Sequence, residues 1–184
     1  MTTETKSTLL SEIKEAGYRL DRQVANLLHI SRLESGMLQV KKDWCDLNDI
    51  IHQSLNKFAP ADRSRIRFVA DQHLPFYKVD YGLIDLVIYN LLHNAIQYTS
   101  PETPVFIETH PGEEGVKIII TDQGPGFPTE TLPFVFDKFY RLPDTAAGGT
   151  GLGLSIAKGF TEAHGGTHSG ADIAINGSAS YLGL

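Results

Sequence analysis

The chain has 184 residues, 41% of them hydrophobic, and a formal net charge of −6 at pH 7, which allows one ordinary core and an extension too small to fold alone. Its 16 Lys and Arg residues form no clustered basic stripe, which argues against a nucleic-acid surface. The single cysteine, Cys45, excludes an internal disulfide framework and favours the reducing cytoplasm, and no run approaches the roughly 20 apolar residues of a membrane helix.

A long amphipathic helix is the first expected element, from about residue 7 to residue 35, with Gly36 as its end signal. Its apolar residues recur at spacings of three, four or seven, which places them on one face: Ile13, Leu20, Val24, Leu27, Leu28 and Leu33. This stripe is close to a heptad seam and too long to leave in water. We therefore expect the helix to pack against a partner helix, which a second copy of the chain could supply.

Residues 47–58 are expected to form a short helix capped by Asp46, followed by short strands at 65–70 and 76–80. The strongest helix prediction covers residues 81–98. Its apolar residues share one face with two asparagines, and a proline follows its end: Leu83, Leu86, Val87, Asn90, Leu91, Asn94, Ala95 and Pro101.

The second half of the chain is expected to contain a hairpin of strands at 104–110 and 115–122. The glycines and prolines of residues 124–128 cannot continue a strand, so a loop begins there. A short helix around 129–138, a further loop, and a helix over 154–164 follow. The tail beyond this helix should hold one or two strands, but its alternation is poor, so we expect the end of the sheet to be incomplete or disordered.

Asn90 and Asn94 are one helical turn apart, so their amides project side by side among residues that should be buried. The simpler interpretation is a pair of core asparagines whose polar atoms bond to neighbouring backbone. The functional interpretation is a cation site, because amide oxygens suit Mg²⁺, which is held by one or two protein oxygens and the oxygens of a phosphate chain. That combination indicates a nucleotide.

Asp122 stands at the exit of an apolar strand and is followed directly by glycines. It could simply cap a turn, because Asp before Gly and Pro is common turn chemistry. It could also accept a hydrogen bond from an exocyclic amine such as that of adenine, while Gly124 and Gly126 let the backbone approach the ring.

Residues 148–159 read as a glycine-rich loop followed by a helix, a junction that offers free N–H groups to a phosphate. The segment is neither a Walker A loop, because Gly-Lys-Ser/Thr is missing, nor a Rossmann fingerprint, because no strand precedes it in a short βαβ unit. Phe136 is expected to pack a short helix onto the core. Arg141, beside the glycine-rich segment, could reach a phosphate.

Four segments in this order resemble the motifs of the catalytic and ATP-binding domain of bacterial two-component sensor histidine kinases, within the wider group that includes gyrase, Hsp90 and MutL. They are similar to the N box, first G box, F box and second G box, respectively: residues 90–99 (NLLHNAIQYT), 122–127 (DQGPGF), 134–141 (FVFDKFYR) and 148–154 (GGTGLGL). Residues 19–51 are similar to the second dimerisation helix and its junction with that domain. Within the family, the chain looks closest to the potassium-responsive sensors.

The resemblance implies an α/β two-layer sandwich, in which helices cover one face of a mixed sheet and the long amphipathic helix precedes it. It divides the chain into a second dimerisation helix, residues 1–40, and a catalytic ATP-binding domain, residues 41–184. It also implies ATP and Mg²⁺ as ligands, a response regulator as partner, a homodimer through the N-terminal helix, and a place in the cytoplasmic part of a membrane-bound sensor.

Carried over by position, the resemblance implies that Asn90 and Asn94 hold Mg²⁺ and the phosphates, and that Asp122 reads the adenine amino group. The other positions implied at the nucleotide are Tyr98 at its border, Gly124 and Gly126 in the adenine pocket, Phe139 and Arg141 in the F box and its mobile lid, and Gly149, Gly151, Gly153 and Leu154 around the phosphates.

In the hydrolysing relatives, a glutamate that activates water stands at the position of Asn90, and an amide cannot accept that proton. We therefore predict a site that binds MgATP and donates its γ-phosphoryl group to a histidine of the dimerisation domain, with Asn90 and Arg141 as catalytic residues. None of the seven histidines has the family's acceptor context, so the acceptor is expected outside this chain. The alternative is a catalytically silent, nucleotide-gated dimerisation or interaction module. Gln97 favours it, because the family usually carries Lys or Arg there, facing the phosphates.

Overall fold

The computed structural model describes residues 3–112, 115–142, 149–174 and 177–183, which form two compact units, Met1–Leu38 and Gln39–Leu184. The first unit is the helix α1 (Thr3–Glu34) and the turn after it, where Gly36 has a φ of 65°. Large apolar side chains of α1 are exposed: Leu9, Leu10, Ile13, Leu20, Val24, Leu27 and Leu28. Within the described residues, no helix has a stretch long and apolar enough to cross a membrane.

The second unit contains a five-stranded mixed sheet and a separate two-stranded sheet. In the large sheet the order is β2-β4-β5-β7-β6, where β2 is parallel to β4 and all other neighbours are antiparallel. The strands of this sheet are β2 (Ile66–Phe68), β4 (Val105–Pro111), β5 (Val116–Thr121), β6 (Thr167–Ala174) and β7 (Gly177–Gly183). The small sheet pairs β1 (Asp43–Cys45) with β3 (Tyr77–Val79).

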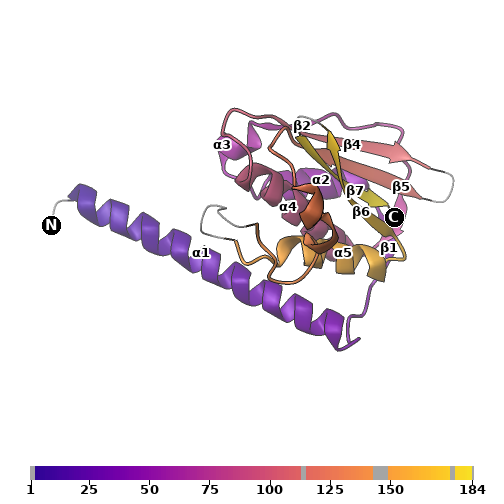
Figure 1. Ribbon diagram of the computed structural model, residues 1–184, viewed down its shortest axis with the longest axis horizontal. Coiled ribbons are helices and arrows are strands. Elements are labelled where there is room, and N and C mark those ends of the chain that lie inside the picture. The colour runs from indigo at the N-terminus through magenta and orange to yellow at the C-terminus, as the bar shows by residue number, and fades with distance from the viewer. Residues whose placement is uncertain (1–2, 113–114, 143–148, 175–176, 184) are drawn as a thin grey trace. The chain divides into compact units, whose positions relative to one another are not determined.

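Three helices lie side by side over one face of the large sheet, as Figure 1 shows. They are α2 (Leu47–Leu55), α4 (Tyr81–Gln97) and α5 (Gly153–Ala163). The short α3 (Pro60–Arg63) precedes β2, and a 3₁₀ helix, η1 (Thr129–Phe134), follows β5. This arrangement confirms the expected two-layer α/β fold with a mixed sheet.

The core lies between these helices and the sheet. Every second side chain is buried along β5 and over the first three residues of β4, the pattern of a sheet that is covered on one face. Helix α4 supplies the largest share from the other layer, and each fully buried Ile or Phe contributes about 1.5–3 kcal/mol. The fully buried side chains of the two helices nearest the site are Ile84, Val87, Ile88, Leu92, Ile156, Ala157 and Phe160.

Several elements differ from the sequence prediction. A 3₁₀ helix replaces the helix expected around 129–138, because Pro133 inside it has no N–H to donate. The tail forms two full strands, so the expectation of an incomplete sheet was wrong. A register shift between Ser169 and Asp172 is the reason that the tail shows poor alternation. The elements β1 and α3 were not predicted.

The start of α4 and the end of α5 are joined through Asp80 and His164. Asp80 caps α4, because its Oδ1 accepts from Leu83 N (3.2 Å), while its Oδ2 accepts from Lys41 N (2.8 Å). Its backbone N–H donates to His164 Nε2 (3.0 Å), so His164 Nδ1 carries the proton that bonds Phe160 O (2.7 Å). This junction fixes how the two helices align along their length.

Replacing Asp80 with Ala should lower the free energy of unfolding by about 1–2 kcal/mol, because the helix loses its cap and Lys41 N loses its acceptor. Urea unfolding followed by circular dichroism measures this. Glu102→Ala, at an exposed position, serves as the control and should stay within about 0.5 kcal/mol of the wild type. Equal midpoints for the two variants would contradict the role given to Asp80.

Candidate functional site

Asn90 is the most deeply placed polar residue of the predicted site. Its side chain is 7% exposed, and its Nδ2 is buried with no hydrogen-bond partner within the part of the chain that the structure describes. A buried amide donor without an acceptor costs about 1–3 kcal/mol. The simpler interpretation, a core asparagine satisfied by neighbouring backbone, is therefore wrong for this donor. Asn94 follows one turn later and is half-buried.

Asn90 faces the first turn of α5. A Cβ built on Gly153 would lie 3.5 Å from Asn90 Oδ1, so the helix begins directly against the amide. The N–H groups of a first turn have no partner inside the helix and favour negative charge. An unsatisfied amide donor and a helix N-terminus thus meet at one point, which suits an anionic group.

Asp122 directly follows β5 and is half-buried. Its Oδ1 accepts a hydrogen bond from Gly124 N at 2.8 Å, so the turn-capping interpretation is correct for this oxygen, and the bond orients the carboxylate. A Cβ on Gly124 would lie 2.9 Å from both Asp122 Oδ1 and Thr99 Cγ2, which leaves no room for any other residue. Gly126 has a φ of 69°, a conformation that favours glycine.

The glycine-rich segment packs against the end of α4 and against the segment that precedes it in the chain. A Cβ on Gly149 would lie 3.1 Å from the Tyr98 hydroxyl and 3.5 Å from Gln97 Nε2. Gly151 has a φ of 70°, and a Cβ there would lie 2.6 Å from the carbonyl carbon of Phe139. Phe139, itself at a φ of 65°, donates its N–H to Gly151 O at 2.9 Å. The predicted F box and second G box are thus joined backbone to backbone.

The predicted N box forms the C-terminal half of α4, and the first and second G boxes contact it through Gly124, Gly149 and Gly153. The predicted F box is linked to this group through the bond between Phe139 and Gly151. Arg141 is exposed and Leu154 is half-buried in the first turn of α5. The catalytic and binding roles assigned to the individual residues stay predictions. Residues 143–148, which complete the expected glycine-rich loop, lie outside the described residues. Sequence reasoning gave no role to Thr99, although it contacts Gly124.

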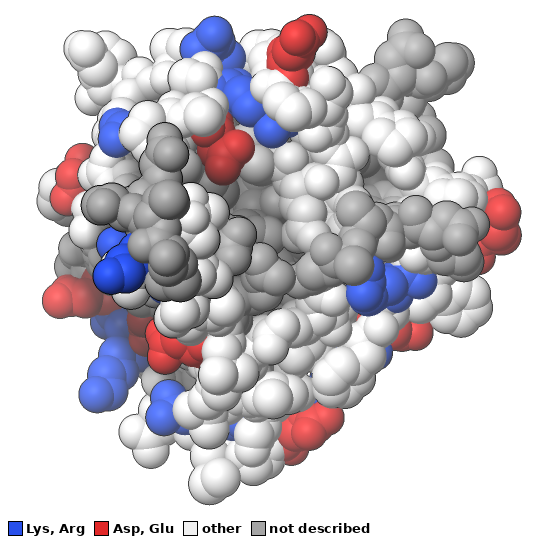
Figure 2. All heavy atoms as spheres, turned by 90° about the vertical axis from the view of Figure 1, so that its left-hand side faces the viewer, with Lys and Arg blue, Asp and Glu red and all other residues white. Residues whose placement is uncertain are grey.

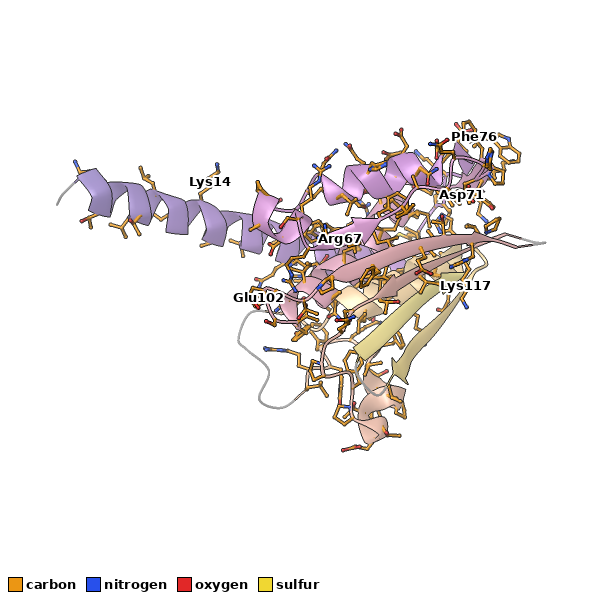
Figure 3. The ribbon with its side chains drawn as sticks, turned by 90° about the horizontal axis from the view of Figure 1, so that it is seen from above. Lys14, Arg67, Asp71, Phe76, Glu102 and Lys117 are labelled. Atoms are coloured by element: carbon orange, nitrogen blue, oxygen red, sulfur yellow. The ribbon has the colours of Figure 1, made fainter. Side chains whose placement is uncertain are left out.

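Figure 3, which labels Glu102 and Lys117, shows the two ends of the large sheet. Glu102, which follows α4, lies at the end where β4 begins and β5 ends, whereas Lys117, at the start of β5, lies at the opposite end. Asp122 and Thr99 therefore belong to the Glu102 end.

Figure 2 shows Lys and Arg scattered among Asp and Glu over the visible face, not gathered in one basic area. Among the described residues, no group of three or more His, Cys, Asp or Glu side chains could hold a metal ion.

Burial, and then the carboxylates of Asp43 and Asp80, raises the pKa of the Cys45 thiol, so Cys45 is a poor nucleophile.

The residues present fit a magnesium nucleotide. Asn90 and Asn94 offer amide oxygens, the neutral hard ligands that Mg²⁺ accepts together with phosphate oxygens. The unpartnered Asn90 Nδ2 is a donor suited to a phosphate oxygen, and glycines at 149, 151 and 153 keep side chains out of the adjoining space.

Comparison with known proteins gives an independent result. The family model "Histidine kinase-, DNA gyrase B-, and HSP90-like ATPase" matches residues 79–178. The sensor protein KdpD of Escherichia coli (strain K12) is 34% identical over 158 residues, which are 85% of this chain and 18% of KdpD. The chain thus spans less than a fifth of the length of that relative.

Two solved structures share the fold. Full-length ShkA in complex with AMPPNP has a TM-score of 0.79 at 23% identity, covering 98% of this chain and 38% of ShkA. The histidine kinase ThkA in complex with the response regulator protein TrrA has a TM-score of 0.74 at 23% identity, covering 99% of this chain and 52% of that one.

Gly151→Ala should lower the affinity for a non-hydrolysable ATP analogue at least about tenfold, because the new methyl group collides with backbone of residues 139 and 140 and separates the two joined segments. Titration calorimetry measures the affinity. Gly165→Ala is the matched control, since Gly165 also has a positive φ, 84°, but nothing lies within 4 Å of its Cβ position. Equal affinities in these two variants would show that the contact with residues 139 and 140 is irrelevant to binding.

Proposed function

Because this chain belongs to the histidine kinase-, DNA gyrase B- and HSP90-like ATPase family, as the ATP-binding catalytic domain of a sensor histidine kinase, we propose that it binds MgATP and donates the γ-phosphoryl group to a histidine outside this chain. The family match and the kinase relatives support ATP binding. The direction of transfer and the acceptor are parts of the proposal.

One observation carries the proposal: the buried Asn90 amide with an unpartnered donor, placed against the glycine that begins α5. A fold that only needed a core residue here would be more stable with an apolar side chain, since an unsatisfied buried donor is costly. The cost is explained if a ligand supplies the missing acceptor. Asp122, held by Gly124 N–H at the same end of the sheet, supplies an acceptor for a base amino group.

Mg²⁺, when bound, would neutralise charge on the phosphate chain, held by the amide oxygens of Asn90 and Asn94. The protein's other contribution would be to position the γ-phosphoryl group and the acceptor, because positioning dominates the catalysis of phosphoryl transfer. The bond between the γ-phosphorus and its bridging oxygen breaks, and its electron pair leaves with ADP. A bond forms to the unprotonated nitrogen of the acceptor imidazole, and the other ring nitrogen then gives up its proton to solvent. Arg141, exposed beside the glycine-rich segment, is proposed to stabilise the charge on the transferred group.

Water is a poor competitor for this phosphoryl group. Asn90 occupies the position from which a glutamate would deprotonate water, and an amide accepts no proton at neutral pH. The site therefore favours a nucleophile that a partner element delivers.

The whole protein is proposed to be a larger sensor of the KdpD type, with this chain in its cytoplasmic part. A response regulator is proposed to receive the phosphoryl group afterwards, as suggested by the solved complex of ThkA with TrrA.

Asn94→Ala and Asp122→Ala should each lower the affinity for a non-hydrolysable MgATP analogue by about tenfold or more, because each removes one polar contact with a charged or hydrogen-bonding ligand group. Calorimetric titration of wild type and both variants measures this. Glu130→Ala, at an exposed position beyond β5, is the control and should bind as the wild type does. Identical binding by all four proteins would disprove the site.

Transfer is tested by mixing the chain with a histidine-bearing dimerisation helix pair and ATP labelled on the γ-phosphate. Label on the acceptor histidine supports the kinase and excludes the silent module. Binding of the analogue without any labelling would leave only the nucleotide-gated interaction module.

The exposed apolar residues of α1 support a homodimer through this helix, in which they would form the seam. Leu20→Glu combined with Leu27→Glu should abolish self-association, because buried carboxylates would face each other across it. Sedimentation at increasing concentrations measures the mass. Arg22→Glu, which the helical period places on the side opposite Leu20 and Leu27, should leave the dimer intact. A wild-type chain that stays monomeric at every concentration would refute this proposal.

A further inference from the structure

Arg65 lies between α3 and β2 and contacts the segment that ends the site helix. Its guanidinium donates to four groups there: Thr103 O (3.1 Å), Ile96 O (3.3 Å), Ser100 O (2.7 Å) and Thr99 Oγ1. Its own backbone oxygen accepts from Val105 N at 3.0 Å. One residue, more than 30 positions away in sequence, thus holds the 96–105 segment at five points.

These contacts are strong for physical reasons. Ile96 O belongs to the last turn of α4, where carbonyls lack partners inside the helix and a positive charge is favoured. A guanidinium offers five donors in a rigid planar fork, so it can serve several carbonyls in one fixed geometry. A lysine ammonium, being a point charge on a flexible stem, could not hold them in the same geometry.

The fixed segment reaches the predicted base pocket through Thr99. The Thr99 hydroxyl accepts from Arg65 and donates to Ala95 O at 2.6 Å, so its rotamer is determined. Its methyl group then lies against Gly124, where a Cβ would be 2.9 Å from Thr99 Cγ2. Gly124 N–H in turn orients the Asp122 carboxylate at 2.8 Å.

We propose that Arg65 is a positioning residue for base selection: it fixes Thr99, Thr99 supports Gly124, and Gly124 orients Asp122 toward the amino group of a purine. The proposal rests on the proposed function, in which Asp122 reads adenine. Adenine presents an amino donor at this edge, whereas guanine presents a carbonyl acceptor, which a carboxylate repels. A displaced Asp122 would therefore lose discrimination between the two bases as well as affinity.

The test compares non-hydrolysable ATP and GTP analogues, with Mg²⁺, on wild type, Arg65→Met and Arg67→Met. Arg67, labelled in Figure 3, is the matched control, because it is an exposed arginine on β2, two residues after Arg65, and its guanidinium donates to Ser64 O (3.0 Å). Arg65→Met should lower the affinity for the ATP analogue about tenfold and reduce the ATP-to-GTP preference, while Arg67→Met changes neither.

A purely structural role would lower stability without changing base preference, so an unchanged ATP-to-GTP ratio in a folded Arg65→Met would overturn the proposal. In an Asp122→Ala background, Arg65→Met should reduce affinity for the ATP analogue much less than in the wild type, because both act on the same contact. Equal losses in the two backgrounds would also overturn it.

If Arg65→Met does not fold, Thr99→Val and Thr99→Ser separate the two ends of the path. Val keeps the methyl group against Gly124 but replaces the hydroxyl that accepts from Arg65, whereas Ser keeps the hydroxyl but removes the methyl group. Both should reduce the ATP-to-GTP preference, and wild-type preference in both would overturn the proposal. A wild type that binds neither analogue would instead refute the proposed function itself.

Discussion

The contact between the Asn90 side chain and the first turn of α5 is the constraint on which the rest depends. It requires a buried amide on α4 and a glycine at the start of α5. The two helices must also be aligned so that Asn90 and Gly153 lie opposite each other. The Asp80–His164 junction supplies that alignment. The apolar side chains of both helices stabilise the pair, and the amide is a local cost within that packing.

The other half of the site is made by loops that the end of α4 holds in place. Tyr98 and Gln97 contact Gly149, and Thr99 contacts Gly124. Arg65 fixes the turn after Thr99 by its bond to Ser100 O. Two loops that are separated in sequence, at Gly124 and at Gly149, are thus both held by the end of α4 and the two residues that follow it. The left-handed conformation of Phe139, which costs free energy in a non-glycine residue, is retained where its N–H bonds Gly151.

Much of this could be predicted from the sequence, because local patterns encode it. The apolar period of α4, the alternation of β5 and the glycines of the loops predicted the individual elements, and the resemblance to the histidine kinase family implied the two-layer fold and the region of the candidate site. The sequence could not predict that residues 129–134 form a 3₁₀ helix, where one proline overrides a helical pattern. It predicted one or two strands in the tail but not that they complete the sheet, because a register shift hides the alternation of β6. Arg65 was missed because its partners begin 31 residues away, and no local spacing marks such a contact. The pairing of Asn90 with Gly153 was equally non-local.

Asn90→Leu tests the central claim most directly, when unfolding by urea and titration with an MgATP analogue are measured on the same protein. Leucine has a similar shape and removes the unpartnered donor, so the free energy of unfolding should stay level or rise, while binding of the analogue should be lost. Unchanged or higher stability together with lost binding would show that the Asn90 amide serves a ligand and not the core. A variant that loses stability yet still binds the analogue as the wild type does would show that Asn90 serves the core and not the nucleotide.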